Sequence, residues 1–147
     1  DTMEQKLRIA KSFGAYTPGL KAVVSVINLG HHRGAVFVDI HAKRCSLFDH
    51  MQLESNISDL KDTVRTAVEK ILQLTDQVQY DVITGCVQKD HSSCGLWCLV
   101  VVELLLFGAD TQTWNDFWSD SLYDVVGYLR MLFVQGYRHT EAFGWSV

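Results

Sequence analysis

An almost uninterrupted apolar segment in the second half of the chain constrains its fold most strongly. Residues 96–107 read LWCLVVVELLLF, so nearly every face of a helix built from them is apolar. Such a helix is expected to run through the core, with Cys94 at its solvent-reachable N-terminal end. A helix N-terminus and a neighbouring imidazolium lower the pKa of a cysteine from about 8.5 to roughly 3.5–7.5, and the thiolate is the attacking species. The pattern predicts a nucleophilic Cys94 with a histidine partner.

A predicted β-hairpin supplies that histidine. Residues 28–39 read as a turn followed by a strand, and residues 45–48 read as the returning strand after a tight turn. The antiparallel return brings Asp49 alongside His32, where a carboxylate can hold an imidazole in one tautomer. Cys94, His32 and Asp49 then provide a nucleophile, a base and an orienting group.

Other histidines and acids near this hairpin fit the roles less well. His31 points to a different face from His32, and the sixteen-residue interval before Asp49 favours His32 as the base. Asp39 falls at the far end of the first hairpin strand, so we reject it as the orienting group. The remaining histidines stand at predicted turns or chain ends and are expected to be exposed: His41, His50, His91 and His139.

A motif around the cysteine resembles a known family. Residues 88–95 read QKDHSSCG, and this Gln-x5-Cys-Gly pattern, with His32 and Asp49 upstream, resembles the ubiquitin-like-specific (SUMO/sentrin) cysteine proteases, which include adenovirus-type proteases. The resemblance covers roughly residues 20–107. It implies a papain-like-superfamily α+β core, in which helices pack a small mixed or antiparallel sheet. It also implies Cys94 as nucleophile, His32 as general base, Asp49 as orienter, and Gln88 with the Cys94 amide as oxyanion hole.

The sequence departs from the family pattern at three points. Arg33 follows His32 where the family has a tryptophan that covers the narrow glycine tail of the modifier. Because a guanidinium differs from an apolar ring, this change bears on how the substrate tail is held. His50 follows Asp49 where the family usually has serine. The chain also begins about thirty residues before His32 and has no Trp-Leu-Asn-Asp-like stretch, so we expect a fragment or shortened member that lacks the N-terminal part of the family domain.

Composition indicates one compact domain, residues 1–147. With 48% hydrophobic residues and a single proline, the chain can bury a core without disulfides or metal and shows no linker. No segment is apolar enough to cross a membrane or to act as a signal peptide, which predicts an intracellular protein, nuclear or cytoplasmic. The net charge of −4 includes no basic footprint for nucleic acid. We expect a monomer that needs no cofactor.

The cysteines permit an alternative interpretation as a metal site. Such a site would gather Cys86, His91, Cys94 and Cys98, but their spacing matches no compact zinc pattern. In a chain without secretory features the four cysteines are expected to be free thiols, with Cys45, Cys86 and Cys98 buried.

Periodicity predicts the remaining elements. Strands are expected at Lys21–Ile27 and Tyr80–Val87. Helices are expected at Thr2–Phe13, at Asp59–Leu74 with Ser58 as its cap, from Trp114, and at Ser121–Val134.

These features predict a thiol peptidase or isopeptidase that acts through an acyl-enzyme on Cys94, at the C-terminal glycine tail of a SUMO-type modifier or its conjugates. Three alternatives stay open. One is a peptidase of the same fold that cuts a polyprotein or other peptide. Another is an inactive module that binds a modifier, and the third is an acetyl-CoA-dependent acyltransferase.

Overall fold

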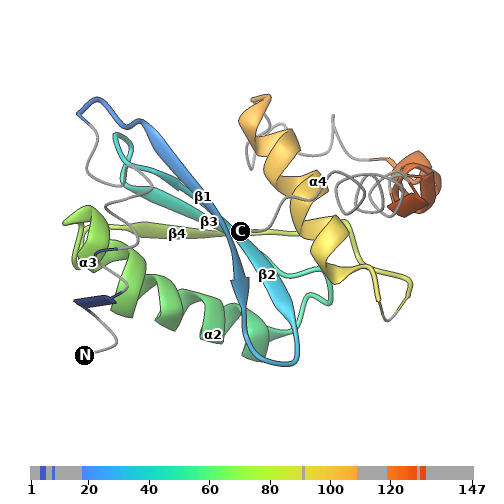
Figure 1. Cartoon of the computed structure of the whole chain (residues 1–147), viewed down its shortest axis with the longest axis horizontal. Helices are drawn as coiled ribbons and strands as arrows, with labels where there is room; N and C mark the ends of the chain where they lie inside the picture. The colour runs from blue at the N-terminus through green and yellow to red at the C-terminus, as the bar shows by residue number, and fades with distance from the viewer. Residues whose placement is uncertain are drawn as a thin grey trace, which may run out of the picture.

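A four-stranded mixed sheet forms the centre of the protein in the computed structural model, which describes residues 4, 5, 8, 18–90, 92–108, 119–128, 130 and 131 (Figure 1). The strands lie in the order β1 (Ala22–Asn28), β2 (Arg33–Asp39), β3 (Arg44–Phe48) and β4 (Gln79–Ile83). β1, β2 and β3 pair antiparallel, and β4 pairs parallel to β3. The predicted first strand and the predicted hairpin are confirmed.

Helices cover both faces of this sheet (Figure 1). The segment that connects β3 to β4 lies on one face and consists of α2 (Glu54–Thr63), a π-helical turn η1 (Val64–Val68) and α3 (Glu69–Leu72). α4 (Cys94–Leu106) lies on the other face, and a helix over residues 121–128 packs outside it through Val126 and Tyr123. The result is the predicted α+β architecture.

The alternation of side chains along β2 creates two cores. Ala35 and Phe37 face α4, where they join a cluster that includes Trp97 and Val101. Val36 and Val38 point to the opposite face and meet the helices that follow β3, because successive side chains of a strand leave opposite faces of the sheet. Both faces of β2 are therefore covered by helices.

The helix predicted at Asp59–Leu74 with Ser58 as its cap is wrong at its start. α2 begins at Glu54, so Ser58 lies within the helix. The Asp49 carboxylate explains the earlier start, because it accepts a hydrogen bond from the backbone amide of Leu53, the residue that precedes the helix, at 2.9 Å. The other end agrees with the prediction to within two residues, since Gln73 adopts a left-handed conformation (φ 58°).

The strand predicted at Tyr80–Val87 is too long at its end. β4 ends at Ile83, and positive φ angles at Gly85 (90°) and Cys86 (52°) are incompatible with an extended strand. Cys86 is buried as predicted, although it lies beyond the strand.

Several sequence predictions fall outside the described residues. These are most of the helix at Thr2–Phe13, the helical stretch from Trp114, and the end of the helix at Ser121–Val134, whose start at residue 121 is confirmed. α4 begins at Cys94 as predicted and is followed by Gly108 with a φ of 101°. Among the described helices, none is long and apolar enough to cross a membrane.

Candidate active site

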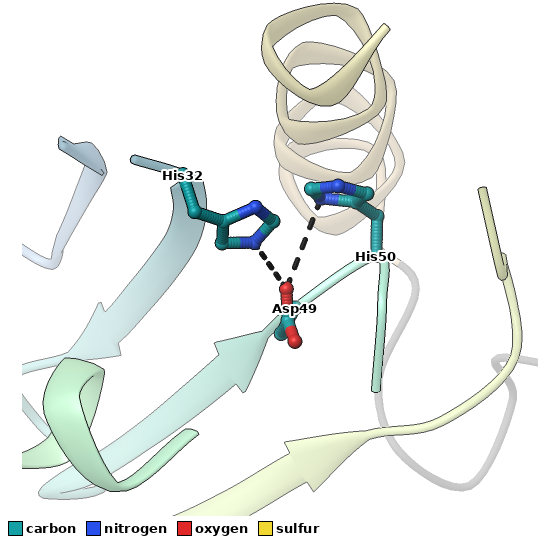
Figure 2. A group of neighbouring side chains, drawn as sticks. All are labelled: His32, Asp49 and His50. Atoms are coloured by element: carbon teal, nitrogen blue, oxygen red, sulfur yellow. Dashed lines mark hydrogen bonds and ion pairs between the residues drawn. The ribbon is translucent and has the colours of Figure 1, made fainter. Parts of the chain in front are cut away.

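The register of the hairpin places His32 against Asp49. Asn28 pairs with Arg33 in β1–β2, and Ala35 pairs with Phe48 in β2–β3. The residue before β2 and the residue after β3 therefore meet at the same end of the sheet. His32 Nε2 and Asp49 Oδ1 form a short hydrogen bond, as Figure 2 shows. Both residues are buried, with exposed fractions of 6% and 0%. With Nε2 held by the carboxylate, Nδ1 is the ring nitrogen left to exchange a proton with another group.

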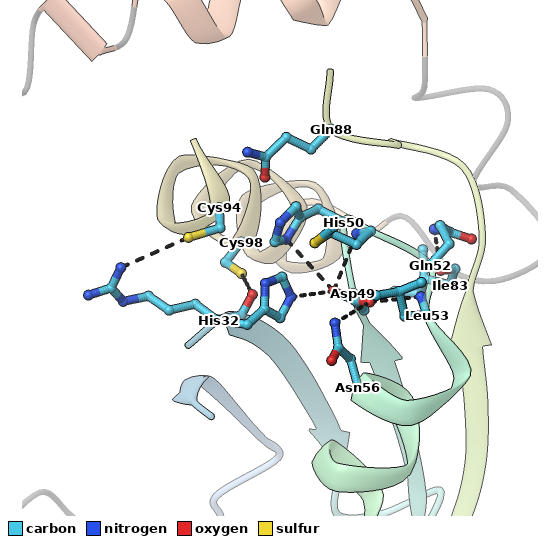
Figure 3. Close-up of polar contacts among 12 residues, drawn as sticks. His32, Asp49, His50, Gln52, Leu53, Asn56, Ile83, Gln88, Cys94 and Cys98 are labelled. Carbon is cyan, nitrogen blue, oxygen red and sulfur yellow. Dashed lines mark hydrogen bonds and ion pairs between the residues drawn. The ribbon is translucent and has the colours of Figure 1, made fainter. Parts of the chain in front are cut away.

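A set of donors holds the Asp49 carboxylate in place (Figure 3). Oδ2 accepts hydrogen bonds from the Leu53 amide at 2.9 Å and from Asn56 Nδ2 at 3.1 Å, and Oδ1 accepts one from the Met51 amide at 3.3 Å. The start of α2 is thus built around this carboxylate. A side chain so fixed can orient the imidazole of His32.

Cys94 lies at the first position of α4, where its half-buried side chain meets the positive end of the helix. Its Sγ atom lies 3.9 Å from Nη1 of Arg33, the residue that follows His32. Among the described residues no hydrogen bond joins Cys94 to His32, and contacts of this kind are often loose until substrate binds. The structure therefore brings Cys94, His32 and Asp49 to the same end of the sheet, and their catalytic roles stay a prediction.

Gln88 lies on the loop before α4, and its side chain is already engaged. Its Nε2 donates to Asp90 Oδ1 at 2.7 Å and to the Asp90 carbonyl, while its buried Oε1 has no hydrogen-bond partner. Asp90 also accepts hydrogen bonds from the Ser92 and Ser93 amides, each at 2.8 Å. Burial acts to raise the pKa of Asp90, but these hydrogen bonds outweigh it and lower the pKa well below its usual value. Gln88 lies on the loop that leads to Cys94, and its side-chain amide donates to Asp90. Its role in the oxyanion hole stays a prediction.

His50 is a member of this cluster that the sequence did not indicate. It was expected to be exposed, which is wrong, because its exposed fraction is 2%. Its ring centroid lies 4.1 Å from that of His32, and its Nδ1 lies 3.8 Å from Asp49 Oδ1 without forming a hydrogen bond (Figure 2). Burial, reinforced by His32, lowers the pKa of His50 to about 4. A neutral imidazole therefore stands beside the His32–Asp49 pair at pH 7. Its only sequence signal is that it directly follows Asp49.

The other cysteines are free thiols among the described residues. Cys45, Cys86 and Cys98 are buried, and burial raises the pKa of Cys98 to about 12, which makes it a poor nucleophile. The alternative metal site predicted from the sequence includes His91, which lies outside the described residues. Within the described part of the chain, the ligand-type atoms that gather within 4.8 Å belong instead to His32, Asp49 and His50. The direct His32–Asp49 hydrogen bond occupies the space in which an ion would have to lie between these two residues.

Comparison with solved structures identifies the fold. The SUMO protease Ulp1 with its catalytic cysteine oxidized to a sulfonic acid superimposes with a TM-score of 0.61 and 16% identity, over 74% of this chain and 52% of that one. The chain has the Ulp1 fold. The sulfenic acid form of Ulp1 gives a TM-score of 0.60 with the same identity and coverage. The α+β core predicted from the sequence therefore has the fold of a solved SUMO protease.

A third structure, ChlaDub1 from Chlamydia trachomatis, matches with a TM-score of 0.45 and 19% identity, over 87% of this chain and 51% of that one. The chain thus spans about half the length of the Ulp1 and ChlaDub1 structures that it matches. No family model and no curated protein matches the sequence.

Proposed function

We propose that the protein is a cysteine peptidase in which Cys94 is the nucleophile, His32 the general base and Asp49 the orienting carboxylate. The observation that carries this proposal is the buried His32–Asp49 pair beside the N-terminal end of α4, where Cys94 lies. An imidazole fixed by a carboxylate and a thiol at a helix N-terminus are the two parts that thiol hydrolysis requires.

The proposed reaction begins with a proton transfer from the Cys94 thiol to His32 Nδ1. The thiolate then attacks the carbonyl carbon of the scissile bond, and the tetrahedral intermediate collapses to a thioester as the leaving amine takes the proton from His32. Water, activated by His32, hydrolyses the thioester and restores the thiol. The Cys94 amide and Gln88 hold the oxyanion, and Gln88 must first exchange its hydrogen bond with Asp90 for one with the substrate.

For the substrate we propose the C-terminal glycine tail of a ubiquitin-like modifier, free or conjugated, with action inside the nucleus or cytoplasm. The support is the likeness to Ulp1, which is a SUMO protease. A peptidase of the same fold acting on another peptide is a second candidate. Arg33 favours it, because an exposed guanidinium beside Cys94 differs from the apolar lid that a glycine tail requires.

The test measures hydrolysis of two kinds of substrate, ubiquitin-like modifiers that carry a fluorogenic group at the C-terminus and a peptide library. Cys94→Ala and His32→Ala are the informative variants. Cys98→Ala is the matched control, since Cys98 lies one helical turn further along α4 and is buried. We expect turnover to disappear in Cys94→Ala and to survive in Cys98→Ala. Gln88→Ala should slow turnover by about two to three orders of magnitude at most. Undiminished turnover in Cys94→Ala overturns the proposal, and modifier binding without any reaction at Cys94 identifies an inactive binding module.

A further inference from the structure

Arg33 makes a contact with the proposed nucleophile that the proposed mechanism does not use. Its Nη1 lies 3.9 Å from Cys94 Sγ, and the Arg33 side chain is exposed. Among the described residues this guanidinium forms no ion pair with a carboxylate, in contrast to Arg44, whose Nη2 lies 2.7 Å from Asp81 Oδ2. The charge of Arg33 is therefore directed at the sulfur.

Both ends of Arg33 are fixed relative to α4. Its backbone is the first residue of β2, and its carbonyl accepts a hydrogen bond from Cys98 Sγ at 3.4 Å. Its Cδ atom lies 3.9 Å from the point where a Cβ atom would stand on Gly95. The stem thus passes the first turn of α4 at a position without a side chain, which lets the guanidinium reach Cys94.

Within the described part of the chain, charged and titratable groups near this thiol come from several elements. The loops before β2 and after β3 contribute His32, Asp49 and His50, and α4 contributes Cys98. The loop before α4 contributes Asp90, whose carboxylate is engaged by the amides of Ser92 and Ser93. Arg130 also approaches this loop, but its Nη2 donates to Ser92 Oγ at 2.6 Å. Arg33 is the cation among these groups that contacts the sulfur itself.

We propose that Arg33 is a catalytic residue that stabilises the Cys94 thiolate as a second positive partner beside His32. The inference rests on the proposed function, in which Cys94 is the nucleophile. A guanidinium stays charged at every physiological pH, whereas an imidazolium loses its charge near neutrality. Arg33 therefore keeps a positive charge beside the sulfur whatever the protonation state of His32.

The expected size of the effect follows from the distance. A cation about 4 Å from a thiolate lowers the pKa of the thiol by roughly one unit or more, and exposure to solvent favours the lower end of this range. One unit corresponds to about tenfold more thiolate at a pH below the thiol pKa.

The experiment measures the rate of Cys94 alkylation by iodoacetamide between pH 4 and 9, with peptide mapping. Iodoacetamide is uncharged, so loss of an arginine does not change attraction of the reagent. We expect Arg33→Gln to move the midpoint of the profile up by about one pH unit and to slow the reaction about tenfold below it. Arg33→Lys should restore most of the wild-type profile. Arg130→Gln is the matched control, since it removes an arginine near the same loop that does not contact the sulfur, and it should leave the midpoint in place.

The outcomes separate this inference from the function on which it rests. If His32→Ala slows alkylation but Arg33→Gln matches wild type, Arg33 has no role and the inference is overturned while the proposed catalytic pair stands. Equal shifts of the midpoint in Arg33→Gln and Arg130→Gln also overturn it. They would mean that loss of any positive charge near this loop changes the reactivity of Cys94, and that the contact of Arg33 with the sulfur has no special effect. If wild-type Cys94 titrates near pH 8.5 and His32→Ala changes nothing, the proposed function and the inference both fail.

Discussion

His50 is a buried histidine whose neutral form the native structure favours. Burial lowers the pKa of His50 to about 4, whereas an unfolded histidine titrates near pH 6.5. Because its folded pKa is the lower one, the stability that it contributes is complete above pH 6.5 and is lost as the pH falls toward 4.

We therefore expect the unfolding free energy of the wild type to decrease between pH 7.5 and 4.5 by about 2 kcal/mol more than that of His50→Gln. Urea unfolding at the two pH values measures this difference. His41→Gln, at an exposed histidine on the far turn of the hairpin, should keep the full wild-type dependence. If wild type and His50→Gln respond equally to pH, His50 does not titrate in the way its burial implies.

The sequence predicted the His32–Asp49 pair because hairpin register alone brings these residues together. His50 was missed because a residue in a turn is ordinarily exposed, and its surroundings include the distant loop before α4, where the Gln88 backbone amide donates a hydrogen bond to the His50 carbonyl at 2.9 Å. The engagement of Gln88 by Asp90 was also missed, since Asx-type hydrogen bonds within a loop leave no periodic pattern.

The contact between β2 and α2 depends on the absence of a side chain at Gly34. A Cβ atom at this position would lie 2.5 Å from Leu60 Cδ1 and 3.0 Å from the Phe48 carbonyl oxygen. Leu60 is fully buried, so it has little room to move aside.

We expect Gly34→Ala to lower the unfolding free energy by about 1–3 kcal/mol through overpacking, as measured by chemical denaturation. Gly127→Ala is the control, since a Cβ atom there meets nothing within 4 Å and the residue lies in a helix. That change should be neutral or stabilise by up to about 1 kcal/mol. A Gly34→Ala variant as stable as the wild type would show that α2 can shift away from the sheet.

The start of α2 depends on Asp49 and Asn56 and not on Ser58. We expect Asn56→Ala to destabilise the protein by about 1.5–3 kcal/mol, because it removes a buried hydrogen bond to a carboxylate. Ser58→Ala should change stability by less than about 0.5 kcal/mol, since Ser58 is an exposed residue inside the helix. Thermal and urea unfolding of both variants distinguish these values. A loss of about 1 kcal/mol in Ser58→Ala is what a helix cap at that residue would produce.

Elements with strong periodicity were predicted well, and their ends were not. β1, the hairpin and α4 follow from patterns that persist over many residues. The start of α2 and the end of β4 depend on a tertiary hydrogen bond at Leu53 and on left-handed backbone at Cys86, neither of which has a signature in the local sequence.

The described residues form two cores that share one sheet, and α4, which carries the proposed nucleophile, packs in only one of them. Val101 and Val64 are both fully buried, Val101 in the core between the sheet and α4 and Val64 in the core between the sheet and α2. Truncating either to alanine should lower the unfolding free energy by about 2–3 kcal/mol.

The two truncations should differ in their effect on Cys94. Val101→Ala loosens the helix that carries the thiol, so we expect roughly fivefold slower alkylation of Cys94 at pH 6, whereas Val64→Ala should leave that rate near the wild-type value. Denaturation and alkylation rates measured side by side test this expectation. Equal rates in the two variants would mean that the position of Cys94 is set by its loop and not by the packing of α4.

For the chain as a whole, the sequence predicted the α+β class. Apolar segments with the period of a helix and segments with the period of a strand alternate along it. The resemblance implied a small sheet packed by helices, whereas the presence of helices on both of its faces is a finding of the structure (Figure 1). The single-domain organisation over residues 1–147 stays a prediction.

The turn at the far end of the hairpin has a further consequence. Residues 41–43 form this turn and are exposed, and Lys43 has a φ of 53°, whereas His32 and Asp49 are held at the opposite end by pairing along β2 and β3. Residues added at this turn would lengthen the interval between His32 and Asp49 without moving either one. The interval of sixteen residues is thus a property of the turn and not of the chemistry. A search for related sequences that fixes this interval will discard proteins that hold the same pair of side chains in the same place.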